Sequence, residues 1–272
     1  MRKRLARTPK RGARGLIAVL LSACLFCPSV GASEGSLGEI LDRASSNASA
    51  FLDLISQVNC TERLTQEKIG DNGKTIERHE SAFDYLVLLS NTGGELSLVE
   101  SRVAPDSNKD SGHEKSPLLV SNGFSMLLLV FHPYYSSGFQ FSLASQETDS
   151  GEALTQVHFQ HIPGTRSPAA LALRGREYPL EISGTAWIDP ASGVIEKIAA
   201  QIGTEMEDVG LRSLHCEIQF SAVSFQSAPR AYWLPSRATV EVESRHQHWR
   251  NTHVFSAYKR FSVNTKEQIS QP

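Results

Sequence analysis

The sequence predicts an α+β protein that is mostly β: a strongly curved antiparallel sheet, or half-barrel, with an N-terminal helix and one inserted helix on its concave side. Three observations predict it. A stretch of helical periodicity comes first, and a long series of segments that alternate between apolar and polar residues follows. One dense apolar segment interrupts the series. We count about eight to ten alternating segments, and an antiparallel sheet of that size must curl.

The first 33 residues are predicted to be a secretory signal peptide. Seven Lys and Arg residues lie in the first fifteen positions, and an apolar run to about Val30 follows. That run is too short for a membrane span, which needs ~20 apolar residues. Small residues favour cleavage after Ala32 or Ser33 and release into the periplasm. In the alternative, the sequence Leu-Ser-Ala-Cys ending at Cys24 resembles a lipobox, which would leave the chain lipid-anchored in the envelope.

The remaining chain, 34–272, is predicted to form a single acidic domain. Removing the seven basic residues leaves 20 Lys and Arg against 29 Asp and Glu, a net charge of −9. Nucleic acid and anionic membrane surfaces would repel such a chain. We therefore expect neither as a partner, and no transmembrane span after cleavage.

The domain begins with the predicted helix. Ser36 and Glu39 have capping-box spacing, and apolar residues recur at helical intervals up to Val58. Period-two alternation starts at Cys60. The helix needs a surface to cover, and the strands that follow supply it.

Turn sequences divide the first strands. Asp-Asn-Gly at 71–73 predicts a hairpin between 61–69 and 75–89. A second turn, 91–94, leads into 95–103. The polar segment 104–117 contains almost no apolar residue and is predicted to be a mobile loop.

The dense apolar segment Gly123–His132 is predicted to be a buried helix that Pro133 ends. Apart from Val130 it lacks β-branched residues, which argues against a strand. Strands resume at 139–144 and 154–162, and a looser stretch follows to residue 179.

The last hundred residues predict further hairpins. Strands 180–188 and 194–202 flank an Asp-Pro-Ala-Ser-Gly turn, and 213–225 alternates. The final strands, 237–249 and 253–263, are expected to turn at Arg250 and Asn251. That register places Glu241 opposite Arg260 on the solvated face, with valine and aromatic side chains on the other.

Four short motifs in this half resemble the outer-membrane lipoprotein-sorting carriers. They are Gly184-Thr185-Ala186-Trp187-Ile188-Asp189-Pro190, Ser192-Gly193-Val194-Ile195, Tyr232-Trp233-Leu234-Pro235 and Tyr258-Lys259-Arg260-Phe261. The resemblance implies an incomplete barrel plugged by helices, with a cavity for acyl chains or another apolar group. It identifies no ligand, since similar folds also serve as sensors and structural modules.

The sequence predicts no catalytic residue and no cofactor. The Gly-x-Ser-x-Gly spacing occurs only at 31–35, across the predicted cleavage site, and the Ser-x-x-Lys spacing only at 256–259, within a predicted strand. After the favoured cleavage only Cys60 and Cys216 remain, and an exported compartment predicts that they form a disulfide. Two buried free thiols are the alternative.

Three histidines form the strongest metal hypothesis. In the expected register His248 faces His253, with His246 on the same face, and zinc accepts three imidazoles. No nearby cysteine completes the set, and hairpin ends often carry solvated histidines, so the sequence predicts no metal.

Two functional hypotheses remain in front. The first is a non-enzymatic envelope protein that binds a lipid or a lipoprotein acyl chain, with the apolar segment as a plug. Its expected ligand-lining residues are Phe124, Leu127, Leu128, Phe131, Phe139, Phe141 and Trp187. The second is a scaffold or interaction module whose interior is filled by its own helices. A metal-dependent hydrolase at the histidine cluster is the third, and no protein partner can be named.

Overall fold

The computed structural model describes the residues 35–92, 95–104, 124–144, 154–173, 176–207, 210–226 and 230–261. The chain divides into two compact units, Met1–Ser33 and Glu34–Pro272. The predicted signal peptide, including Cys24, and nearly all of the predicted mobile loop at 104–117 lie outside the described residues.

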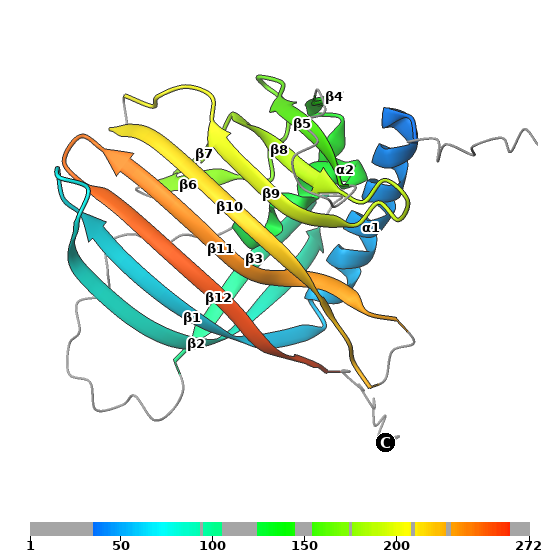
Figure 1. The fold of residues 1–272 in the computed structure, drawn as a ribbon, viewed down its shortest axis with the longest axis horizontal. Coiled ribbons are helices and arrows are strands. Elements are labelled where there is room, and N and C mark those ends of the chain that lie inside the picture. The colour runs from blue at the N-terminus through cyan, green and yellow to red at the C-terminus, as the bar shows by residue number, and fades with distance from the viewer. Residues whose placement is uncertain are drawn as a thin grey trace, which may run out of the picture. The chain divides into compact units, whose positions relative to one another are not determined.

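The N-terminal helix α1 (Leu37–Ile55) begins as its capping box predicts. The Ser36 hydroxyl accepts from the Glu39 backbone N–H, and the Glu39 carboxylate accepts from that of Ser36. The apolar stripe of α1 is buried, with Ala44 and Ala48 fully so. In Figure 1 the helix lies on the side of the sheet away from the viewer.

Ten antiparallel strands form one open sheet, which confirms the predicted fold class. Its order is β3-β2-β1-β12-β11-β10-β9-β8-β5-β4, and Figure 1 shows it curling around its inner face. The strands are β1 (Val58–Ile69), β2 (Thr75–Thr92), β3 (Glu95–Val103), β4 (Phe139–Leu143), β5 (Thr155–His161), β8 (Ile182–Ile188), β9 (Ile195–Ile202), β10 (Leu211–Val223), β11 (Tyr232–Ser244) and β12 (His248–Arg260).

The predicted hairpin turns between β1 and β2 and between β8 and β9 are present. Gly73 has φ 74° between β1 and β2, and Gly193 has φ 71° between β8 and β9. The stretch up to residue 179, which looked irregular in the sequence, contains a separate hairpin of β6 (Ala170–Leu173) and β7 (Arg176–Pro179).

The inserted apolar segment is helical, as predicted, but it is a 3₁₀ helix, η2 (Phe124–Phe131). Pro133 ends it and starts the short helix α2 (Pro133–Ser136). The hydroxyl of Tyr134 in α2 lies 3.5 Å from the backbone N of Leu96, in the edge strand β3. Since β4 follows α2 after two residues, this helix connects the two edges of the open sheet.

The predicted register of the last hairpin is wrong. The turn lies at Ser244–Gln247, where the Ser244 backbone N donates to the Gln247 carbonyl at 2.8 Å, and not at Arg250 and Asn251. Glu241 consequently pairs with Arg250 instead of Arg260. The expected complementary charges are therefore present, with a different arginine.

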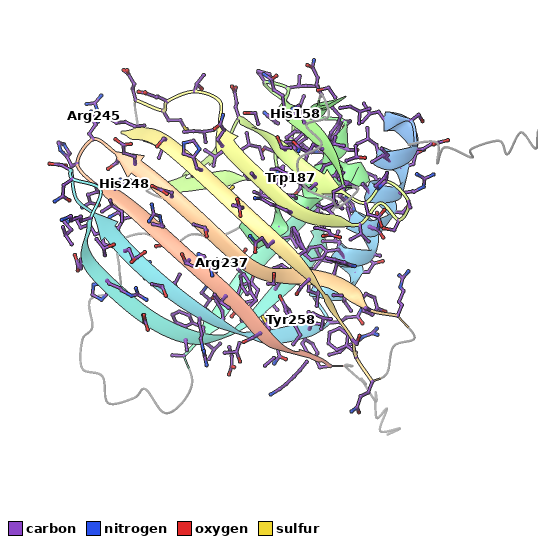
Figure 2. The ribbon with its side chains drawn as sticks, in the orientation of Figure 1. His158, Trp187, Arg237, Arg245, His248 and Tyr258 are labelled. Carbon is purple, nitrogen blue, oxygen red and sulfur yellow. The ribbon has the colours of Figure 1, made fainter. Side chains whose placement is uncertain are left out.

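The last strand also contains a bulge. Ala257 has φ 54°, and the pairing of β12 with β1 shifts by one residue beside it. The shift turns Tyr258 inward, and its hydroxyl donates to the Pro235 carbonyl at 2.7 Å. Two of the four motifs, the Tyr-Trp-Leu-Pro strand start and the closing strand, are thus joined by a hydrogen bond (Figure 2).

Candidate functional site

The inner face of the sheet holds the expected apolar site, and the protein's own side chains occupy it. Five consecutive residues of η2, Leu127 to Phe131, are at most 3% exposed. They pack against α1 and against β9, β10 and β11. A hollow of about 750 Å³ lies on the other face of the sheet.

Most of the expected ligand-lining residues gather in this core. Leu127, Leu128, Phe131 and Phe139 are buried in one cluster, and Phe141 packs at its edge. The Phe131 ring lies 5.3 Å from Phe141 and 6.3 Å from Phe159, a neighbour that the sequence analysis did not select.

Two of the expected lining residues are not placed in the core. The side chain of Phe124 lies outside the described part of the structure. Trp187 belongs to the opposite face of β8, where Lys197 lies 4.8 Å from its ring centre. The alternation of β8 explains this, because Ala186 and Ile188 on either side of Trp187 are fully buried.

The form of η2 is unusual for a buried segment. A 3₁₀ helix has poorer hydrogen-bond geometry than an α-helix and rarely continues beyond 3–4 residues, yet η2 has eight. Its side chains from Met126 onward are all apolar. Nondirectional apolar packing therefore holds these side chains in place.

A second part of the inner face is polar and buried, which the sequence analysis missed. Glu62 in β1 is completely buried and accepts hydrogen bonds from Arg102 (3.0 Å) and His253 (2.7 Å). Arg102 also binds Glu100 at 3.1 Å. Beside them Gln66 donates to the Asn251 side chain across the β1–β12 pair.

This network holds a charged carboxylate away from water. Burial alone would raise the pKa of Glu62, but the hydrogen bonds from His253 and Arg102 and their charges outweigh it, so the pKa is lowered. Burial alone would lower the pKa of Arg102, but the two glutamates outweigh it, so that pKa is raised. The period-two alternation of β1 could have indicated this burial, because Glu62 and Gln66 lie an even number of residues from the buried Cys60 and point to the same face.

The expected histidine cluster does not form. His248 lies on the outer face, within 2.6 Å of a Glu241 oxygen, whereas His253 lies on the inner face against Glu62. His246 is exposed in the turn. Residues five apart on a strand face opposite sides, so only the misplaced turn brought these imidazoles together. Among the described residues no group of three or more His, Cys, Asp or Glu side chains is arranged to hold a metal.

The predicted disulfide is also absent. Cys60 and Cys216 are both buried free thiols. They lie on β1 and β10, and two strands, β12 and β11, separate them in the sheet. Three strand spacings of ~4.8 Å far exceed the reach of a disulfide. Burial raises the pKa of each thiol to about 12.

Comparison with known proteins gives distant structural matches. No family model matches the sequence, and no curated protein matches it. Similar solved structures are an outer-membrane lipoprotein-sorting protein domain from Vibrio parahaemolyticus, at 12% identity and a TM-score of 0.39, and a DUF1329 family protein from Desulfovibrio piger, at 12% and 0.38. Each covers 84% of this chain, and the matches span 94% and 95% of those chains.

The description of the first of these structures names the family that the sequence motifs resemble. Neither match transfers a ligand or an activity to this chain. In the described part of the chain, every helix is too short or too polar to cross a membrane.

Proposed function

We propose that this protein is a non-enzymatic, exported envelope protein that takes up an apolar chain, such as the acyl chain of a lipid or lipoprotein, on the inner face of its sheet. The chain would enter in exchange for η2. The observation that carries the proposal is the long 3₁₀ helix in that position, whose side chains from Met126 to Phe131 are buried. The signal-like N-terminus supports export, because basic residues precede a short apolar run.

The free energy gained by burying the acyl chain and that lost by exposing η2 are of similar size. Burial of an acyl chain of about 14 methylene groups gains roughly 11 kcal/mol, at ~0.8 kcal/mol each. Full exposure of the six side chains from Met126 to Phe131 would cost roughly 9–18 kcal/mol. The two quantities have the same order, so η2 must shift beside the bound chain and remain partly covered.

Met126 supplies a native reporter of that movement. It is 2% exposed in η2, whereas Met206, which lies between β9 and β10, is partly exposed and serves as an internal reference. The purified protein is incubated with a fluorescent fatty acid and then treated with dilute peroxide. Saturable uptake that raises sulfoxide formation at Met126, with no change at Met206, is the expected result.

A pair of variants tests the role of the plug. Leu128→Ala weakens the packing of η2, so the apparent affinity for the fatty acid should increase at least tenfold. Leu88→Ala, at a leucine 55% exposed on the outer face, is the control and should bind as the wild type does. Absence of lipid in extracts of the protein, together with no uptake by either variant, would refute the proposal.

A filled-interior scaffold is the second candidate, and the burial of Met126 to Phe131 in η2 favours it. It predicts that Leu128→Ala lowers stability without any uptake, and that crosslinking in the envelope recovers a protein partner. A metal-dependent hydrolase is not proposed, because His248 and His253 lie on opposite faces of the sheet.

A further inference from the structure

The outer face of the sheet carries a separate polar trough. It has a volume of about 750 Å³ and crosses six strands, from β4 to β11. That volume is in the range of small-ligand sites, ~300–1,000 Å³. His158 and Trp187 mark the β5 and β8 part of this face in Figure 2.

Twelve of the seventeen lining residues form two adjacent rows perpendicular to the strands. The other five lie between the rows at positions of inward parity: Phe141, Phe159, Gly184, Ala200 and Cys216. In each row the residues are direct cross-strand partners, which places them ~4.8 Å apart. The first row is Gln140, Gln160, Ser183, Gln201, His215 and Glu241.

The second row lies two residues further along each strand. It contains the shorter side chains that form the floor, with Thr185 and Ala199 directly opposite each other. The row is Ser142, His158, Thr185, Ala199, Glu217 and Thr239.

Four side chains of the first row are free to bind a ligand. In the described part of the chain, the side chains of Gln140, Gln160, Gln201 and His215 make no hydrogen bond to protein. All four are exposed. The row therefore offers amide and imidazole groups, which donate and accept, at regular intervals across the sheet.

The charges of the trough are already compensated. Lys197 lies 2.8 Å from Glu217, and Arg250 binds Glu241 at 3.2 Å. His248 contacts Glu241 as well. No Lys or Arg is among the lining residues. A charged ligand would find no unpaired counter-ion here, and a wholly apolar one would leave the polar groups of the first row without partners.

We infer that the trough binds a neutral, hydroxyl-rich oligosaccharide that lies across the strands along the two rows. Sugar rings in a chain present hydroxyl groups at a repeat close to the strand spacing, and amide side chains can donate to one hydroxyl and accept from the next. An extended peptide has a repeat of ~3.3 Å and falls out of step with groups ~4.8 Å apart. The two rows project from the outer face of the sheet, whereas the proposed apolar site lies on its inner face.

The test uses the full-length processed protein and chitotetraose, with cellotetraose as a second neutral probe. Isothermal titration should show saturable binding. Gln160→Ala and Gln201→Ala should each weaken it at least tenfold. Gln156→Ala is the matched control, because Gln156 lies on β5 outside the two rows. This variant should bind the tetrasaccharide with the affinity of the wild type.

Two further probes separate the alternatives. An acidic oligosaccharide and a neutral Gly-Ser-Gln peptide of similar length should bind at least tenfold more weakly than chitotetraose. The inference is overturned if either binds more tightly, if no neutral tetrasaccharide binds up to its solubility limit, or if Gln156→Ala weakens binding as much as Gln201→Ala.

Discussion

Replacing Glu62 with Gln should be among the most destabilising single polar substitutions in this protein. The Glu62 carboxylate is completely buried, and the Arg102 and His253 side chains that bind it are 15% and 3% exposed. Removing one partner of a buried ion pair costs about 3–5 kcal/mol. We expect the low end, about 3 kcal/mol, because the amide of Gln still accepts a hydrogen bond and Arg102 keeps Glu100 at 3.1 Å.

The same substitution should remove part of the pH dependence of stability. The pKa of Glu62 is lowered in the folded protein, so its contribution is complete above the pKa of the unfolded chain and is lost as the pH falls through the folded value. The difference in the free energy of unfolding between wild type and Glu62→Gln should therefore be largest near neutral pH and should shrink in acid.

Urea unfolding followed by circular dichroism, repeated from neutral to acidic pH, measures both effects. Glu77→Gln is the control, since Glu77 binds His79 at 2.8 Å in an exposed pair, and its unfolding midpoint should not move. A loss below about 1 kcal/mol for Glu62→Gln, the size typical of a surface pair, would refute the argument. So would a difference from wild type that is independent of pH.

Three further outcomes follow from the structure. Gly193→Ala should cost about 3 kcal/mol in urea unfolding, because φ is 71° and an added Cβ would lie 2.3 Å from the Arg43 Cβ. Ser36→Ala should cost about 1 kcal/mol by loss of the helix cap, with a parallel loss of helical signal on heating. Cys60 and Cys216 should resist iodoacetamide at pH 8 in the folded protein and should react once the protein is unfolded in denaturant without a reducing agent. A disulfide-linked peptide in the mass spectrum would contradict this.

Local signals in the sequence were sufficient for most of the fold. The capping box at Ser36 and the turn at Gly193 depend on neighbouring residues, and both lie where they were expected. The last hairpin was misplaced because Asn251 has turn-forming chemistry and low β propensity. In the structure its amide is buried and accepts a hydrogen bond from Gln66, a residue far away in the chain. Long-range pairing of this kind cannot be read from local propensity.

The site was harder to predict because alternation was read as apolar inside and polar outside. Glu62 and His253 both violate that rule, because their hydrogen bond offsets the free-energy cost of burying each side chain. The disulfide was predicted from the exported compartment and from the even number of cysteines, and neither carries information about strand order. Only the topology, with β12 and β11 inserted between β1 and β10, separates the two thiols.

The register of the sheet is what allows one chain to carry two chemically different faces. In β8, Ala186 and Ile188 face the apolar core, while Ser183 and Thr185 line the polar trough. A slip of one residue would exchange the two sets and destroy both faces. The positive φ of Gly193 and the packing of its turn against α1 fix this register where the chain reverses between β8 and β9. Mutations in that turn should therefore impair both proposed sites, whereas substitutions within one face should leave the other intact.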